Sequence, residues 1–76
     1  MAQFNLGFMF YRGEGVSQDR VQAYAWINIA VVQGNLDAHR NFRNFIANSM
    51  TFDEITRAQK LSDDLRQAFG LDGRTK

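Results

Sequence analysis

Apolar residues recur along the chain at intervals of three and four, with little of the alternation that is typical of strands. This periodicity predicts four helices, over residues 2–12, 19–33, 35–48 and 52–69. Pro is absent, and most of the glycines stand between these segments. The pattern therefore predicts an all-α protein.

Several residues between the periodic segments are suited to ending a helix. Gly13 and Gly15 allow the left-handed backbone that would strain other residues, so we expect the first helix to stop there. Gly34 and Gly70 suit the ends of the second and fourth helices. The residues after Gly70 are expected to form a flexible tail, 71–76.

Other residues are suited to starting a helix. Asp19 with Gln22 has the spacing of a capping box at the second helix. Thr51 with Glu54 has the same spacing at the fourth helix, and Asn35 can cap the third. These signals support the four predicted segments.

The two halves of the chain echo each other. Apolar positions of the first and third segments recur at an offset of 36, and those of the second and fourth at an offset of 35. The paired residues are Ala2 with Ala38, Leu6 with Phe42, Phe10 with Ile46, Ala23 with Ala58, Trp26 with Leu61, and Ala30 with Leu65. A period of this length, built from two helices, is typical of a helical solenoid.

The packing of the first helix pair can be predicted from residue size. Small residues at Gly7, Ala23 and Ala30 would let the two helices approach closely. Larger side chains would then fill the space between them, namely those of Leu6, Phe10, Trp26 and Ile27. The fourth helix has one apolar face, and its polar remainder suits a terminal cap.

The first helix is apolar on two sides. One stripe contains Leu6 and Phe10, and a second, nearly opposite stripe contains Phe4, Phe8 and Tyr11, with Arg12 beside it. A helix apolar all round is expected to be covered on more than one side. The cover could be a partner segment, a second copy of the chain, or an upstream repeat of a longer protein. Aromatic and Arg side chains dominate interface energies, so these residues are the predicted partner-binding set.

Composition narrows the function classes. A 76-residue chain buries only about 60% of its unfolded surface, and this one has no Cys for disulfides. The single His39, which we expect at the surface among polar neighbours, cannot form a zinc site alone. Self-association or a partner would supply the missing stability. No metal or cofactor is predicted.

Charge and candidate chemistry argue against other classes. The net charge of +1 lacks the basic excess of most nucleic-acid binders, and Arg40, Arg43 and Asn44 are expected to form a solvated face. No apolar run is long enough to cross a bilayer. No nucleophile with a base and an orienting group is evident, so we do not expect an enzyme. Without a signal segment or Cys, a cytoplasmic location is expected by default, or a periplasmic one if the chain is a fragment.

Residues 2–34 carry a dense motif, AQFNLGFMFYRGEGVSQDRVQAYAWINIAVVQG. The segment resembles one complete Sel-one-like repeat, a relative of the tetratricopeptide repeats, with the pattern A-x-x-x-L-G-x-x-Y-x-x-G-x-G-V-x-x-D-x-x-x-A-x-x-W-x-x-x-A-A-x-x-G. The matching positions are Ala2, Leu6, Gly7, Gly13, Gly15, Val16, Asp19, Ala23, Trp26, Ala30 and Gly34. Phe10 stands where the family prefers Tyr, Val31 where a second Ala is usual, and Ser17 where Pro is common.

Residues 35–70 resemble a degenerate final repeat, in which MTFDEITRAQKL is similar to the helix that closes many bacterial arrays of this family. The resemblance implies one domain over 1–70, with two helix-turn-helix repeats forming a short right-handed α-α superhelix. It also implies a protein-interaction module, an adaptor or scaffold. Together with the apolar sides of the first helix, this predicts a protein that self-associates through that helix or binds a protein or peptide. The alternative is a small helical nucleic-acid-binding protein.

Overall fold

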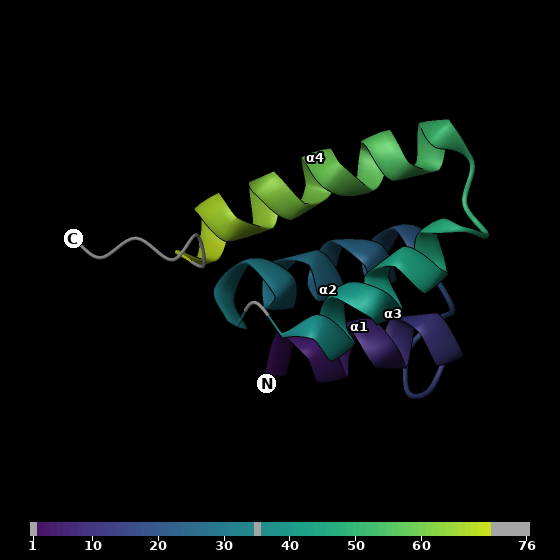
Figure 1. Ribbon diagram of the computed structural model, residues 1–76, viewed down its shortest axis with the longest axis horizontal. Coiled ribbons are helices and arrows are strands. Elements are labelled where there is room, and N and C mark those ends of the chain that lie inside the picture. The colour runs from purple at the N-terminus through teal and green to yellow at the C-terminus, as the bar shows by residue number, and fades with distance from the viewer. Residues whose placement is uncertain (1, 35, 71–76) are drawn as a thin grey trace.

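The computed structural model describes residues 2–34 and 36–70, and these form four α-helices (Figure 1). The helices are α1 (Ala2–Arg12), α2 (Arg20–Gly34), α3 (Asp37–Ala47) and α4 (Phe52–Phe69). The predicted all-α class is confirmed, and each predicted boundary lies within two residues of the observed one. The expected tail 71–76, the cap Asn35 and the side chain of Ala2 lie outside the described residues.

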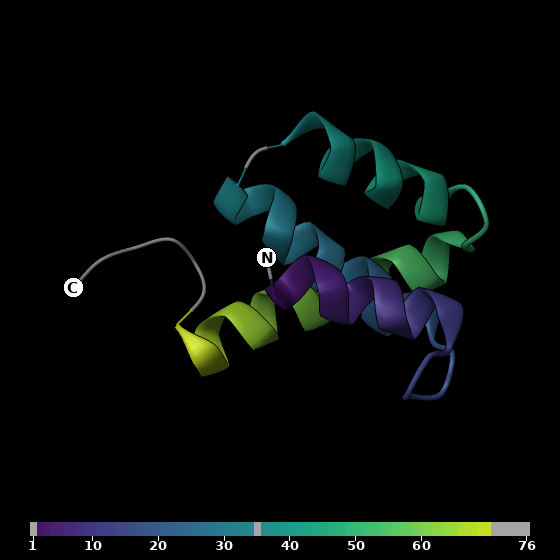
Figure 2. The same cartoon turned by 90° about the horizontal axis from the view of Figure 1, so that it is seen from below.

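Helix α2 is the centre of the arrangement. The most extensive helix–helix contacts join α2 to each of the other three helices. Consecutive helices run in opposite directions, and α4 lies across α2 from α1 (Figures 1 and 2). Helices α1 and α2 follow each other in the chain and pack against each other. Helices α3 and α4 pack chiefly against α2 rather than against each other.

The interior is built on the buried face of α2. Ala23, Ile27 and Val31 lie at helical spacing on this face, and they pack with Ile46 of α3 and Ala58 of α4. Trp26, which we expected among the residues filling the α1–α2 interface, is only half-buried. Its ring lies 6.3 Å from that of Phe69 at the end of α4. Ile27, which is fully buried, therefore lies at the centre of the core in place of Trp26.

Small residues allow α1 and α2 to approach closely, as predicted. Gly7 is buried on α1, and Ala23 and Ala30 are buried on α2. A Cβ atom at Gly7 would lie 2.7 Å from Cδ1 of Ile27 and 3.0 Å from the backbone oxygen of Ala23. Real Cβ atoms do not tolerate such distances, so the crossing requires glycine on α1.

The turn between α1 and α2 has the expected left-handed glycines. Gly13 and Gly15 have φ angles of 74° and 78°. Asp19 caps α2, because its Oδ1 accepts a hydrogen bond from the backbone N–H of Gln22 at 3.1 Å. The backbone N–H of Asp19 donates to the oxygen of Phe10 at 3.0 Å, which ties the start of α2 to the last turn of α1.

The ends of α4 also agree with the sequence. Thr51 and Glu54 form a complete capping box, with bonds of 2.9 and 3.1 Å. Gly70 ends the helix in the left-handed conformation, with φ of 65°. The third helix differs: its N-cap is Leu36, which makes no side-chain capping bond.

Candidate interaction surface

Aromatic side chains of α1 and α3 form one continuous cluster. Spacings of four and three residues place Phe4, Phe8 and Tyr11 on one side of α1, as predicted. The ring centroids of these residues lie 5.8, 5.6 and 5.3 Å from that of Phe42 on α3. Such separations fit tilted and edge-to-face aromatic packing. We call the set Phe4, Phe8, Tyr11, Phe42 and Phe45 the α1/α3 aromatic surface.

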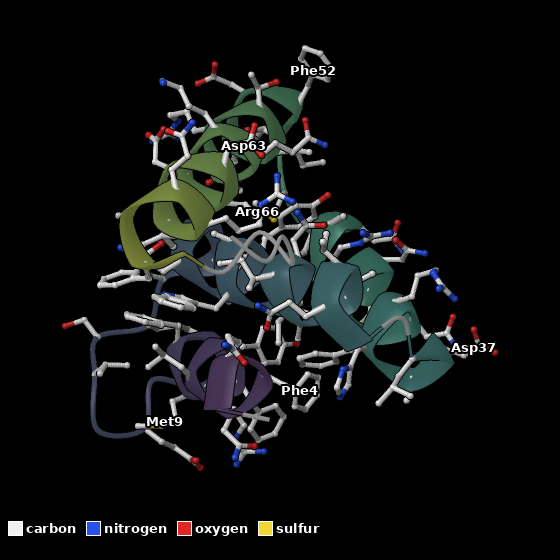
Figure 3. The ribbon with its side chains drawn as sticks, turned by 90° about the vertical axis from the view of Figure 1, so that its left-hand side faces the viewer. Phe4, Met9, Asp37, Phe52, Asp63 and Arg66 are labelled. Atoms are coloured by element: carbon white, nitrogen blue, oxygen red, sulfur yellow. The ribbon has the colours of Figure 1, made fainter. Side chains whose placement is uncertain are left out.

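The cover of the aromatic side of α1 is therefore α3 of the same chain. Figure 3 shows Phe4 on the side of α1 that faces α3. The three covers expected from the sequence were a partner segment, a second copy of the chain and an upstream repeat. Helix α3 was not among them. The echo of Leu6 at Phe42 was the available signal, because it placed an aromatic residue in the middle of α3. Phe4, Phe8 and Tyr11 are half-buried by this packing.

One ring of the α1/α3 aromatic surface remains largely open. Phe45 is 57% exposed, although its ring lies 6.1 Å from Phe42 and 6.1 Å from Tyr11. The ring thus packs beside Tyr11 and Phe42, while more than half of its surface is exposed. A large apolar ring that is held in place while exposed is suited to insertion into another surface.

Arg12, the fourth predicted partner-binding residue, lies at one end of this surface. Its guanidinium carbon is 5.6 Å from the centroid of Phe8, a distance that allows a cation–π interaction. Its Nε also lies 3.2 Å from a carboxylate oxygen of Glu14, and both side chains are more than half exposed. The structure therefore brings all four predicted residues together and adds Phe42 and Phe45.

The prediction for His39 is wrong. This side chain is only 7% exposed, and its ring stacks on Phe4 at 4.2 Å with an interplanar angle of 15°. Among the described residues, its Nδ1 has no hydrogen-bond partner. Its polar sequence neighbours suggested solvent, but α1 lies over this part of α3. The contact is between segments far apart in the sequence, so local composition could not reveal it.

A chain of polar side chains joins three helices. Arg43 of α3 donates from Nη1 to Oδ1 of Asn28 on α2 at 2.9 Å. The amide of Asn28 donates in turn to Oγ of Ser62 on α4 at 3.0 Å. Ser62 is fully buried and Arg43 is half-buried, so the expected solvated face of α3 is wrong at this position. We call Arg43, Asn28 and Ser62 the three-helix relay.

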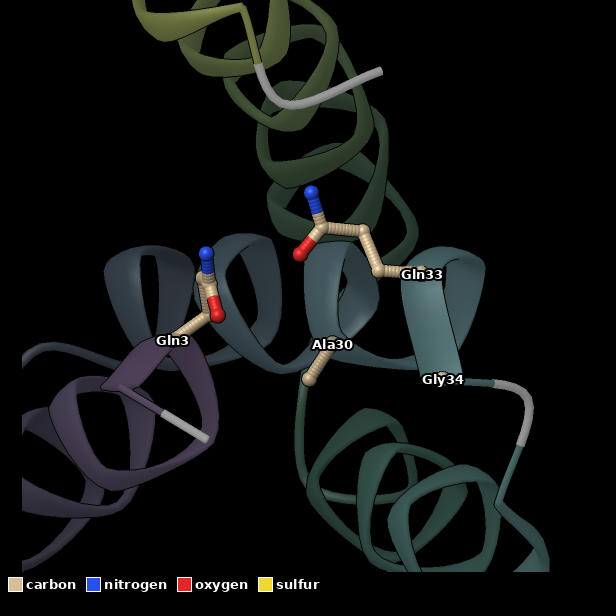
Figure 4. A pocket seen from close by; sticks show the side chains of 4 residues that line it. All are labelled: Gln3, Ala30, Gln33 and Gly34. Carbon is tan, nitrogen blue, oxygen red and sulfur yellow. The ribbon is translucent and has the colours of Figure 1, made fainter. Parts of the chain in front are cut away.

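A shallow hollow lies between the start of α1 and the end of α2 (Figure 4). Its volume is about 310 Å³, and its lining includes Gln3, Ala30, Gln33 and Gly34. Carboxamides do not titrate near neutral pH, so these side chains cannot act as a general acid or base. The described carboxamides of the lining can accept and donate hydrogen bonds.

The three aspartates of α4 are distributed over ion pairs along the helix, and Glu54 belongs to the capping box. Asp53 pairs with Arg57, Asp64 with Lys60, and Asp63 with Arg66. Each carboxylate faces a cation one turn away rather than another carboxylate. Within residues 2–34 and 36–70, no group of three or more His, Asp or Glu side chains is arranged to hold a metal ion.

Comparisons with known proteins give no relative from which a role could be transferred: no protein-family model, curated protein or solved structure matches the chain. Of the helices described, none combines the length and the apolar character needed to span a membrane.

Proposed function

We propose that this protein is a protein-interaction module whose contact surface is the α1/α3 aromatic surface. Phe45, held by Tyr11 and Phe42 yet 57% exposed, is the observation that carries the proposal. Half-buried neighbours fix its ring, so little side-chain entropy is lost on binding. Arg12 at the edge supplies a charged group of the kind that borders interface hot spots.

The occupant that fits best is a protein or peptide segment with an apolar side chain able to rest on Phe45. The flanking charge is shared between Arg12 and Glu14, which is the mixed polar rim expected at a protein contact. The proposed architecture is the short right-handed superhelix of two Sel-one-like repeats, with residues 2–34 as the complete repeat and 35–70 as the degenerate capping repeat. The α1–α2 pair and its glycine turn support the first repeat.

Self-association is a second candidate. Several large apolar side chains besides Phe45 are exposed, and a second copy could cover them: Val32, Leu36, Phe52 and Phe69. Phe4 and Phe8 are half-buried against Phe42, so they offer less surface to a second copy than Phe45 does. A homodimer is therefore better built through Phe45 than through the middle of α1.

Nucleic acid is a less suitable partner. Arg12, Arg40, Arg57, Lys60 and Arg66 each form an ion pair with a carboxylate of the same chain. Phosphate binding relies on cations that gather on one face with their charge available. Of the remaining described cations, Arg20 lies on α2 and Arg43 on α3, and Arg43 is half-buried, so few cations on the described helices have their charge available.

Selection from a phage-displayed peptide library tests the proposal. The wild type and a Phe45→Glu variant should be used in parallel, with Phe52→Glu as the matched control. Phe52 is 86% exposed at the start of α4, so its replacement adds the same charge outside the aromatic surface. We expect peptides that bind the wild type and the Phe52 variant and lose most of their affinity for the Phe45 variant.

Two results would contradict the proposal. One is a selection that yields no peptide dependent on Phe45 while all three proteins remain folded. The other is a set of peptides that bind all three proteins equally. Light scattering of the same samples addresses self-association, since a dimer that Phe45→Glu dissociates would favour the second candidate.

A further inference from the structure

Arg43 is half-buried and is anchored by a hydrogen bond to α2. Its Nη1 bonds Asn28, and Asn28 is fixed by the fully buried Ser62, so the guanidinium is held by a chain of bonds that begins on α4. Its Nη2 reaches Oδ1 of the exposed Asn44 only at 3.5 Å. That distance is at the limit of a hydrogen bond. One edge of the guanidinium is therefore anchored and the other is nearly free.

Within the described residues, the anchored cation has no acidic counterpart. Its hydrogen-bond acceptors, Asn28 and Asn44, are both neutral amides. In the described part of the chain, Arg43 belongs to none of the ion pairs, and its buried Nε has no acceptor. Half-buried guanidinium groups are normally matched by a carboxylate or phosphate, because their charge is costly to desolvate alone.

A second guanidinium lies one turn from the relay. Arg66 follows Ser62 by four residues, so it projects from the same side of α4. Figure 3 places it between the ribbon of α4 and those of α2 and α3. Its side chain is 24% exposed and pairs with Asp63, yet its Nε is also buried without an acceptor among the described residues. Two Arg side chains thus have incomplete hydrogen bonding where α3 and α4 flank α2.

We propose that Arg43, with Arg66 one turn along α4 from Ser62, forms a binding site for a carboxylate at the junction of α2, α3 and α4. Nη2 can donate to a carboxylate oxygen, and the bond of Nη1 to Asn28 reduces the entropy lost on binding. The carboxylate comes from an acidic side chain of a bound peptide or from a small dicarboxylate. This site does not use the α1/α3 aromatic surface, so either proposal can fail without the other.

Nuclear magnetic resonance of the wild type tests the site directly, because each Arg Nε–Hε pair gives its own cross-peak. Sodium glutarate and an N-acetylated Glu-Glu dipeptide amide are the two probes, with sodium chloride at equal ionic strength as the reference. We expect saturable shifts of the Arg43 and Arg66 cross-peaks. Tighter binding of the dipeptide would identify a peptide source, and tighter binding of glutarate a small molecule.

Arg57 provides the matched control. It lies on the same protein, is 62% exposed and pairs with Asp53 at 3.6 Å. Its cross-peak should move only as much as it does in chloride, and Arg57→Gln should leave the dissociation constant unchanged. Arg43→Gln should raise that constant about tenfold or more. Shifts that do not saturate, or that affect Arg57 equally, would overturn the site. Tighter binding of inorganic phosphate than of either probe would overturn its assignment to carboxylates.

Discussion

The side chain of Ile27 occupies the space directly over Gly7, where an added Cβ atom would lie 2.7 Å from its Cδ1 and 2.8 Å from its Cγ1. Ile27 is also fully buried at the centre of the core, so it has little room to withdraw. The backbone oxygen of Ala23 would lie 3.0 Å from the same Cβ atom, and it has even less room to move. This contact sets the distance between α1 and α2, on which the position of the aromatic side chains depends.

Replacing Gly7 by Ala should therefore destabilise the protein, although Ala favours helices elsewhere. We expect a loss of about 1–3 kcal/mol in the free energy of unfolding, because the added methyl group overpacks the interface. Urea unfolding followed by circular dichroism measures the change. Gly34→Ala is the control, since its Cβ would approach Leu36 no closer than 3.9 Å. A Gly7→Ala variant as stable as this control would contradict the close crossing.

The three-helix relay should contribute to stability through its buried acceptor. Ser62→Ala leaves the amide of Asn28 without its partner on α4. The expected loss is about 1–3 kcal/mol, the usual effect of an unsatisfied part-buried donor. The same substitution at the exposed Ser17 serves as the control in thermal unfolding. Equal melting temperatures for the two variants would show that the relay is not formed in solution.

The capping box of α4 gives a smaller and separate effect. Thr51→Ala removes the hydroxyl that accepts from the N–H of Glu54, and we expect a loss of about 1 kcal/mol. Thr56, whose hydroxyl donates back to the oxygen of Phe52 within the helix, is the control for the loss of a Thr side chain. A Thr51→Ala variant no less stable than Thr56→Ala would mean that the first turn of α4 is frayed.

Substituting both Phe4 and Phe8 by Asp should unfold the chain. Phe4 stacks on the buried His39, and the rings of Phe4 and Phe8 both contact Phe42. The double substitution would therefore place two carboxylates in the α1–α3 contact. Far-ultraviolet circular dichroism should show loss of helix. A folded, monomeric double variant derived from a dimeric wild type would instead place these rings at an interface between two copies.

The local features of this fold could be read from the sequence, and the contacts between distant segments only in part. Gly13, Gly15, Thr51 and Glu54 act through neighbouring backbone, so their roles follow from spacing alone. The small residues Gly7, Ala23 and Ala30 also predicted the close α1–α2 crossing.

The site depended on longer-range packing. His39 and Arg43 were expected in solvent because their sequence neighbours are polar. His39 is covered by α1 and Arg43 is bonded to α2, and the periodicity of α3 could not indicate either contact. Ser62 was missed for a related reason: a single hydroxyl on an otherwise apolar stripe gives no signal until its partner Asn28 is known.

The packing of the α1 aromatic residues on α3 within one chain is tested most directly by isotope-filtered nuclear Overhauser spectroscopy. A mixed sample of labelled and unlabelled protein separates contacts within a chain from contacts between chains. We predict strong intramolecular effects from the Phe4 ring to His39 and Phe42, whose centroids lie 4.2 and 5.8 Å away. Effects found only between labelled and unlabelled chains, or no effects from Phe4 to α3, would contradict the account.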